Sequence, residues 1–367
     1  MQKPKILVTA AAGKTGAATA LQLLQQGYPV RALVRQIDDR SERLKNAGAE
    51  LMVGSLEDIV DLRASLTGVQ RAYFCPPLQS GTLRRATLFA EAAREAKLEV
   101  VVALSQWVAD PSHPALHARE KWLSNRVLGW IPGVDVVTVN PGWFADNYMA
   151  ALEPMAQFGV MAMPLGGGLN APPSTEDIAR VIAGALTNPG PHIGKSYRPT
   201  GPRLLAPDEI AAIMGKVLGR PVKYQNAPLT LFLKVAKSLG YSDFVIGQLY
   251  WFLQDYQRNA FGVGAPTNAV LDVGGSQPED FEQIARRYAA TFRHSKQGAG
   301  ARFRASLNLV KALLTVTPKI GEIARQLEIP HLVHATLAVD SAIWRASHEP
   351  GYRAPATTDP GELAPAD

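Results

Sequence analysis

Short apolar runs alternate with amphipathic stretches along the first 142 residues. The apolar runs predict strands, and the stretches between them repeat apolar residues with the 3.6-residue period of a helix. The expected strands are residues 5–10, 29–35, 49–55, 69–77, 99–105 and 134–142, and the expected helices are 16–27, 41–48, 56–68, 83–97 and about 116–130. Because these strands are apolar nearly throughout, both faces of their sheet must be covered. The pattern therefore predicts an α/β fold, a doubly wound parallel sheet of the Rossmann type.

The regular alternation ends at Gly142. A segment rich in aromatic residues, methionine and glycine (143–168) comes next, and mostly helical patterns follow it. We expect helices at 174–189, 206–219, 229–260 and 278–294, two more within 302–345, and short strands at 195–201 and 221–228. The expected division is a Rossmann domain over 1–150, which the strand near 195–200 rejoins, a smaller and mostly helical α/β domain over 151–295, a helical extension over 296–345, and a tail over 346–367. The proline-rich, polar composition of that tail is typical of disorder.

Composition narrows the class of protein. No apolar run reaches the roughly 18–20 residues that span a bilayer, and the N-terminus lacks the pattern of a signal peptide. One cysteine, Cys75, allows no internal disulfide and fits a reducing compartment, so the expected location is the cytoplasm. The net charge of +6 is uneven, because residues 286–319 hold eight cations and no acid. We interpret that run as a solvated surface, with a homodimer contact or a peripheral anionic surface as alternatives, and we expect no nucleic-acid partner.

The stretch VTAAAGKTG (8–16) lies between the first strand and the first helix. Backbone N–H groups at such a turn bind a pyrophosphate, and side chains at Gly13 or Gly16 would obstruct that approach. The candidate cofactor contacts here are Ala10, Gly13, Lys14, Thr15 and Gly16. Ala10 stands where a first glycine is usual, which an alanine tolerates if its φ is negative. A phosphate-binding P-loop is excluded because Val8 occupies the position of its first glycine. The alternative is that both glycines only permit a tight turn.

Arg35 ends the second expected strand, nineteen residues beyond Gly16. NAD-selective folds place an acidic residue there to hold the ribose hydroxyls, whereas an arginine fork suits a 2′-phosphate. The sequence therefore favours NADP(H) as the cofactor. The alternative is a surface arginine compensated by Asp38 and Asp39.

Three further stretches carry a family resemblance: GSLEDIVDLRASLTGVQRAYFCPP (54–77), VNPGWFADN (139–147) and YRPTGPRLLAPDEIAAIMGKVLGRPVKY (197–224). With the glycine turn, they resemble the NmrA-like branch of the atypical short-chain dehydrogenases/reductases over about residues 3–295. That branch includes quinone- and isoflavone-reductase-like enzymes and NADP-binding regulators. The resemblance implies a Rossmann domain and a smaller domain with the substrate cleft between them. Ala10 and Ser55 depart from its usual pattern.

The resemblance also implies contacts at the ends of later strands. Pro141 and Gly142 would line the nicotinamide amide, and Cys75 and Pro76 would lie beside the cofactor groove, with Cys75 interpreted as a small buried residue. Aromatic and apolar residues that follow the fifth and sixth strands would form the substrate pocket, or else fill the joint between domains. These candidate substrate residues are Trp107, Trp143, Phe144, Asn147, Tyr148 and Met161.

Candidate catalytic residues follow the fifth strand. Ser105 ends it, and His117 and Lys121 share one face of the next helix because they are four residues apart. Ordinary short-chain dehydrogenases carry a Tyr-x-x-x-Lys pair on this helix, and its tyrosine passes a proton to the substrate. This segment has no tyrosine, so we expect His117 to donate or relay the proton and Lys121 to contact the cofactor. The alternative is that His117 faces water at the helix start. The other histidines lack the acidic or thiol company of a metal site, so none is predicted.

The sequence thus leads to two functional hypotheses. The first is an NADPH-dependent reductase that transfers hydride to a small apolar carbonyl, quinone or activated C=C substrate. The second is a protein that binds NADP(H) and senses redox state without turnover, which the missing tyrosine favours.

Overall fold

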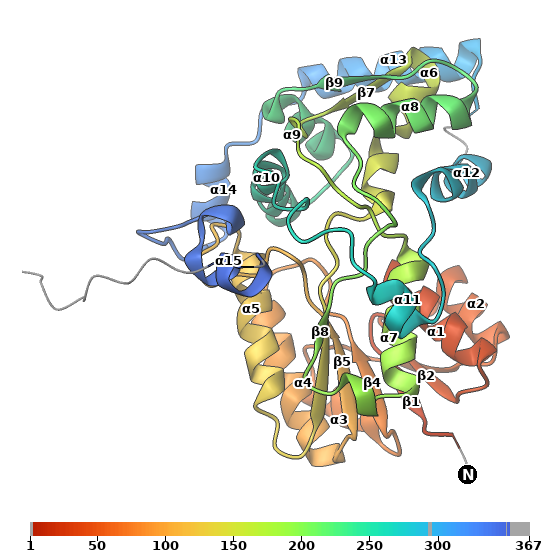
Figure 1. The fold of residues 1–367 in the computed structure, drawn as a ribbon, viewed down its shortest axis with the longest axis vertical. Helices are drawn as coiled ribbons and strands as arrows, with labels where there is room; N and C mark the ends of the chain where they lie inside the picture. The colour runs from red at the N-terminus through yellow and green to blue at the C-terminus, as the bar shows by residue number, and fades with distance from the viewer. Residues whose placement is uncertain (1–2, 293–295, 350, 353–367) are drawn as a thin grey trace, which may run out of the picture.

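The computed structural model describes residues 3–292, 296–349 and 351–352. Most of the tail predicted over 346–367 lies outside this range, and its predicted start was wrong, because residues 346–348 are the end of a helix. In the described residues, six strands between residues 6 and 139 and a seventh at 196–197 form a parallel sheet, called the main sheet, in the order β3-β2-β1-β4-β5-β6-β8 (Figure 1). Its strands are β1 (Ile6–Val8), β2 (Val30–Val34), β3 (Glu50–Val53), β4 (Arg71–Phe74), β5 (Val100–Leu104), β6 (Asp135–Val139) and β8 (Ser196–Tyr197). The doubly wound α/β fold predicted from the sequence is confirmed.

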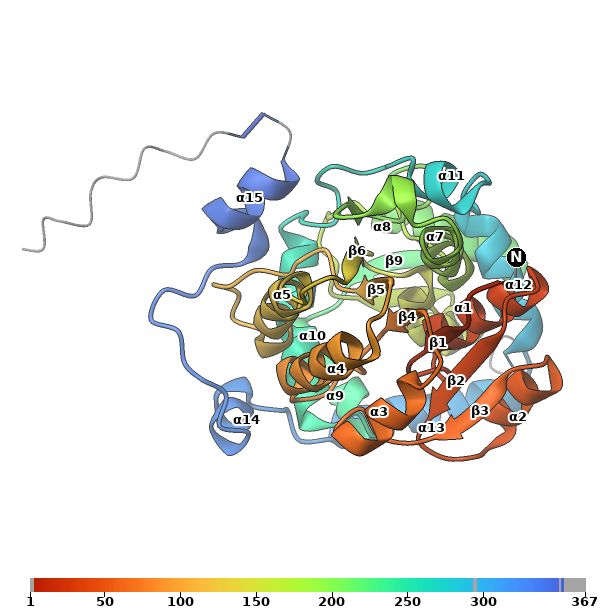
Figure 2. The ribbon, with the colours of Figure 1, turned by 90° about the horizontal axis from the view of Figure 1, so that it is seen from below.

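Helices cover both faces of the main sheet (Figure 2). One face packs against α1 (Lys14–Gln25) and α7 (Thr175–Thr187), and the other against α3 (Ile59–Leu66), α4 (Thr82–Ala96) and α5 (Leu116–Gly129). The helix α2 (Asp39–Asn46) follows β2 at the edge, where Asp38 caps its first turn. Because the central strands β1, β2, β4 and β5 are buried on both sides, their continuous apolar runs in the sequence are explained by two separate cores.

The remaining chain forms a smaller, mostly helical region beyond the carboxyl ends of the strands (Figure 1). It contains a second parallel sheet of β7 (Val160–Met163) and β9 (Lys223–Asn226), built from described residues. Its helices are η1 (Ala145–Ala151), α6 (Leu152–Phe158), α8 (Pro207–Leu218), α9 (Leu229–Ser238), α10 (Asp243–Gln257), α12 (Phe281–Thr291), α13 (Ala299–Leu314), α14 (Ile320–Gln326), η4 (Ala338–Asp340) and α15 (Ala342–His348). Two further helices belong to the main sheet: η2 (Gly190–His192) joins α7 to β8, and α11 (Ala269–Gly274) packs against α7.

Two expectations for this region were wrong. The single helix predicted over 229–260 is two helices, because Gly240 adopts a left-handed conformation (φ +84°) that ends α9. The segment 143–168 contains the unpredicted strand β7, whose partner β9 lies some 60 positions along the chain. Pairing over such a separation leaves no local pattern to recognise. A third core of aromatic residues and methionine joins this region to the main sheet.

Candidate functional site

The turn between β1 and α1 is shaped by Ala10. Its φ is +46°, so the condition of a negative φ, under which an alanine is tolerated at this position, is not met, and the residue occupies a backbone region that favours glycine. The carbonyl of Ala10 accepts a hydrogen bond from Gly13 N at 2.8 Å. A Cβ on Gly16 would lie 2.3 Å from the same oxygen, and one on Gly13 would lie 3.0 Å from it. Both glycines are thus required by the turn itself, which leaves the start of α1 free of side chains.

The first helical turn is open to an anion. The cap residue Gly13 offers no side chain to the N–H groups of α1. The Thr15 side chain turns inward, where its Oγ1 accepts from Tyr73 Oη at 3.0 Å and lies 3.6 Å from Cys75 Sγ. Lys14 extends outward to an ion pair with Asp146, at 3.1 Å from Nζ to Oδ2. The backbone, rather than the threonine hydroxyl, is therefore the available donor set.

A cavity of about 610 Å³ continues from this turn along the ends of β2 and β3. Arg35 and Arg40 line it after β2, and Gly54 and Ser55 line it after β3. Asp38 pairs with Arg40 and caps α2, so it does not compensate Arg35 as the alternative supposed. Within the described part of the chain, Arg35 has no ion pair and is exposed to the cavity. An arginine in this position attracts a phosphate group.

The helix α5 brings His117 and Lys121 together on one buried face. His117 Nδ1 lies 3.2 Å from Thr82 Oγ1, and its backbone N donates to Gln248 Oε1 at 2.9 Å. The alternative in which His117 faces water is wrong, because the residue is only 5% exposed. Burial, with the nearby Lys121 and Arg85 cations, lowers the pKa of His117 well below its usual value of 6.5. The imidazole is therefore neutral at physiological pH.

Lys121 and Ser105 meet at the end of β5. Lys121 Nζ donates to the Leu104 carbonyl, and burial lowers the pKa of Lys121 to about 8. Ser105 Oγ accepts from Asn125 Nδ2 at 2.8 Å. Asn125 was not predicted as a site residue, although it lies four residues beyond Lys121 on the same face of α5 and so continues the spacing of His117 and Lys121. Together these residues fix one serine hydroxyl and one buried ammonium beside the strand end.

The segment after β6 supplies less open surface than the sequence predicted. Of the candidate substrate residues here, Phe144 and Asn147 remain partly exposed. Trp143, Tyr148 and Met161 are buried in the third core, where the Tyr148 hydroxyl bonds the Tyr256 hydroxyl at 2.7 Å. In this conformation those three side chains have almost no surface to offer a ligand.

The last candidate substrate residue, Trp107, is covered by the C-terminal part of the chain. Trp344 Nε1 donates to the Trp107 carbonyl at 2.7 Å, and the His348 ring lies 4.3 Å from the Trp107 ring. The Arg198 guanidinium stacks on Trp107 at 3.7 Å and donates to the Phe261 carbonyl at 2.6 Å. Burial lowers the pKa of Arg198 to about 9. Arg198 directly follows β8, and the sequence analysis did not predict it as a site residue.

Residues 336–348, which we call the C-terminal strap, are held by buried polar groups. The Asp255 carboxylate accepts from Ala338 N at 3.0 Å and from His113 Nε2 at 2.6 Å. His113 Nδ1 accepts from Ala115 N, so the ring proton is on Nε2. Ser341 Oγ donates to Asp110 Oδ2 at 2.7 Å. The strap is therefore an integral wall above the end of β5.

The positions of Pro141 and Gly142 agree with a strand-end contact. The Pro141 carbonyl accepts from Trp107 N at 3.1 Å, so β5 and β6 stay joined past their ends. A Cβ on Gly142 would lie 3.2 Å from the Phe261 ring and 3.5 Å from Arg198 Nη2. Cys75 and Pro76 follow β4, between this pair and the glycine turn in the strand order. The candidate cofactor residues thus lie along one edge of the main sheet.

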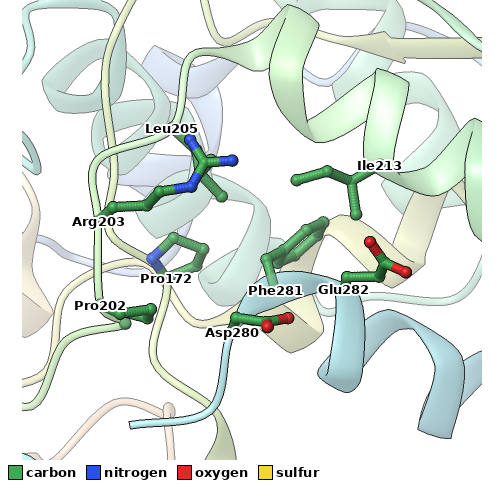
Figure 3. Close-up of a pocket in the computed structure, with 9 residues that line it drawn as sticks. Pro172, Pro202, Arg203, Leu205, Ile213, Asp280, Phe281 and Glu282 are labelled. Carbon is green, nitrogen blue, oxygen red and sulfur yellow. The ribbon is translucent and has the colours of Figure 1, made fainter.

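A smaller cavity of about 180 Å³ lies apart from this edge, among the loop after β8, α8 and the start of α12 (Figure 3). Phe281 and Pro172 form its apolar wall, and Arg203, Asp280 and Glu282 surround it. Arg203 pairs with Glu209, Glu282 pairs with Lys216, and Asp280 caps α12. Because its charges are already engaged, this cavity adds nothing to the site.

Comparison with known proteins agrees with this fold. Residues 2–114 match the model of the NmrA-like family. An NAD(P)H azoreductase of Xenophilus azovorans is 28% identical over 294 residues, which are 78% of this chain and 99% of that protein. These findings confirm the resemblance to the NmrA-like family of atypical short-chain dehydrogenases/reductases.

Two solved structures share the fold. The NADPH-dependent quinone oxidoreductase of Escherichia coli, solved with NADPH, has a TM-score of 0.67 at 23% identity and covers 77% of this chain and 99% of its own. NmrA, a negative transcriptional regulator solved with NADP, has a TM-score of 0.66 at 18% identity over 81% of this chain and 100% of its own. Both structures are matched almost entirely, while about a fifth of this chain lies outside each match.

Proposed function

We propose that this protein is an NADPH-dependent reductase acting on a small apolar carbonyl, quinone or activated C=C substrate. The observation that carries the proposal is the cavity of about 610 Å³, which joins Gly13, the cap residue of α1, to Arg35, which forms no ion pair among the described residues. Its two ends match the two anionic groups of NADPH, a pyrophosphate and a 2′-phosphate. The NAD(P)H azoreductase relationship, which covers nearly all of that protein, supports the reaction class.

The residues present fit that cofactor. Gly13 and Gly16 keep the turn free of side chains, Arg35 provides a fork for the 2′-phosphate, and Pro141 with Gly142 would border the nicotinamide. When bound, the cofactor would supply a hydride and an electron-rich ring. The chain itself would orient the reactants and exclude water, which together provide most of the rate.

Proton supply would rest on the buried face of α5. Lys121 has a pKa near 8 and is therefore mainly protonated at neutral pH, so it would place positive charge beside the end of β5. His117 is neutral at this pH, because its pKa is lowered, so it would pass a proton on without holding it. Its Nδ1 is hydrogen-bonded to Thr82 Oγ1. Asn125 would hold the Ser105 hydroxyl toward the reacting atoms. Water would supply the proton if His117 does not.

The proposal is tested by measuring NADPH oxidation with a panel of quinones and enones. Arg35→Asp should lower the affinity for NADPH about a hundredfold and the affinity for NADH only slightly. The change removes a charge-assisted contact to the 2′-phosphate and adds a carboxylate that repels it. Arg43→Asp is the matched control, since Arg43 is an exposed arginine of α2 that does not line the cavity. Equal losses for NADPH and NADH, or no binding of either by the wild type, would refute the assignment.

The second candidate is a sensor that binds NADP(H) without turnover. The covering of Trp107 by the strap favours it, because the predicted substrate side of the edge is occupied by the chain's own side chains. NmrA, with the same fold, is a transcriptional regulator. Calorimetry with NADP⁺ and NADPH separates the candidates: clearly unequal affinities, with no acceptor reduced across the panel, would favour the sensor.

A further inference from the structure

The helix α13 carries an exposed apolar stripe. Phe303, Leu307, Val310 and Leu314 recur at intervals of four, three and four residues, so they lie on one face of the helix. Their exposed fractions are 66%, 53%, 51% and 81%. A row of four large apolar side chains left in water is unusual for a helix that has a core to pack against.

The opposite face of α13 holds it to the protein. Ala305 and Ala312 are buried there, and the helix contacts α9 and α6. Asn308 Nδ2 donates to Glu153 Oε2 at 2.9 Å, and the Lys234 ammonium donates to the Leu313 carbonyl. The helix is therefore docked by small residues, and its apolar stripe points away from the molecule.

Cations border the stripe on both sides. At 100° per residue, Arg304 and Lys311 fall on one flank and Arg302 on the other. All three are exposed, and no aspartate or glutamate occurs between residues 283 and 321. Arg304 is already paired, because its Nε lies 3.9 Å from Glu153 Oε1 on α6, whereas Arg302 and Lys311 form no ion pair among the described residues. Long basic side chains beside an apolar stripe can reach outward while their stems cover apolar surface.

The position of α13 leaves this face accessible. It crosses the end of the molecule farthest from the main sheet (Figure 1), and exposed Val316 continues the apolar surface past its C-terminus. A planar surface can therefore meet the stripe without meeting the edge that holds the candidate site.

We propose that α13 binds the surface of an anionic lipid bilayer. The stripe would enter the boundary between headgroups and acyl chains, and Arg302 and Lys311, one on each flank, would contact lipid phosphates. Charge decides between this occupant and a second copy of the chain. Pairing two α13 helices through their stripes would bring flanking cations together, and α13 has no carboxylate to offset them. An anionic headgroup layer complements both flanks at once.

The experiment is co-sedimentation of the full-length protein with vesicles of phosphatidylcholine, alone or with about a third phosphatidylglycerol. We expect binding to the anionic vesicles that falls with added salt, and at least tenfold weaker binding to the neutral ones. The double variant Leu307→Gln, Leu314→Gln should lose binding. The double variant Arg302→Gln, Lys311→Gln should weaken binding about twenty-five-fold, at about fivefold for each cation.

The matched control is Val60→Gln with Trp130→Gln, because both residues are exposed apolar side chains of the Rossmann part. It should bind as the wild type does. The proposal is overturned if the folded wild type ignores anionic vesicles, if both vesicle types bind equally, or if the Leu307, Leu314 variant still binds. It is also overturned if that variant instead converts a dimer into a monomer, which light scattering would detect.

Discussion

The two halves of the carboxyl edge of the main sheet differ in what covers them. At β1, β2 and β3 the edge opens into a cavity bordered by backbone N–H groups and an unpaired arginine. At β5, β6 and β8 it is covered by Trp344, His348 and the stacked Arg198. The first half is made by the turns that follow neighbouring strands, all within residues 10–85, whereas the second is assembled from segments far apart in sequence. The proposed cofactor side and the proposed substrate side of this edge can therefore change independently of each other.

The largest effect is expected from removing the Trp344 side chain, which covers one half of the edge. The side chain is 1% exposed and bonds the Trp107 carbonyl, so Trp344→Ala should lower the free energy of unfolding by about 4 kcal/mol. NADPH affinity, which depends on the other half, should change less than threefold. Urea unfolding and calorimetry measure the two quantities. Ile343→Ala, half exposed on the same helix, is the control and should cost under about 0.5 kcal/mol. An equal loss in both variants would show that the strap is only loosely attached.

Gly16→Ala should damage the open half. The new Cβ would meet the Ala10 carbonyl at 2.3 Å, so the turn must shift, at a cost of about 2 kcal/mol. Because the shift moves the N–H groups of α1, NADPH binding should weaken with it. Gly129→Ala at the end of α5, where an added Cβ meets nothing, provides the comparison. Unaltered NADPH affinity in Gly16→Ala would mean that the turn does not hold the pyrophosphate.

His117 gives the covered half a pH dependence. Its pKa is lowered in the folded state, so below pH 6.5 the unfolded chain binds a proton that the folded chain does not. Stability should therefore fall with pH in that range, by about 1 kcal/mol between pH 6.5 and 5.5 from this residue. Urea unfolding at the two pH values should show a smaller difference in His117→Gln than in the wild type. The prediction fails if both proteins lose stability equally.

The smallest effect is expected at Ala10. Glycine accepts a φ of +46° without strain, so Ala10→Gly should raise the free energy of unfolding by at most about 1 kcal/mol, after the added entropy of the unfolded chain. NADPH affinity should stay the same or improve. Thermal unfolding measures the change, and a clear loss of stability would show that the methyl group makes contacts that outweigh its strain.

Residues set by local rules were predictable, and residues set by distant contacts were not. The doubly wound fold and the strand-end placement of Gly13 and Arg35 follow from apolar periodicity and loop spacing. The positive φ of Ala10 did not, because an alanine carries no sign of the turn it occupies. The covering of Trp107 by Trp344 joins residues 237 positions apart, and no pattern near either one indicates it. Asn125 could have been predicted from the sequence, since it continues the four-residue spacing of His117 and Lys121.

The Asp255 carboxylate joins His113 and Ala338, which are 142 and 83 positions away from it along the chain. Closing loops of that length costs more chain entropy than forming neighbouring strands, and contacts of long sequence separation slow folding. We therefore expect refolding in two stages, with the main sheet formed first and the indoles of Trp107 and Trp344 brought together last. Tryptophan fluorescence would lag behind the recovery of backbone circular dichroism.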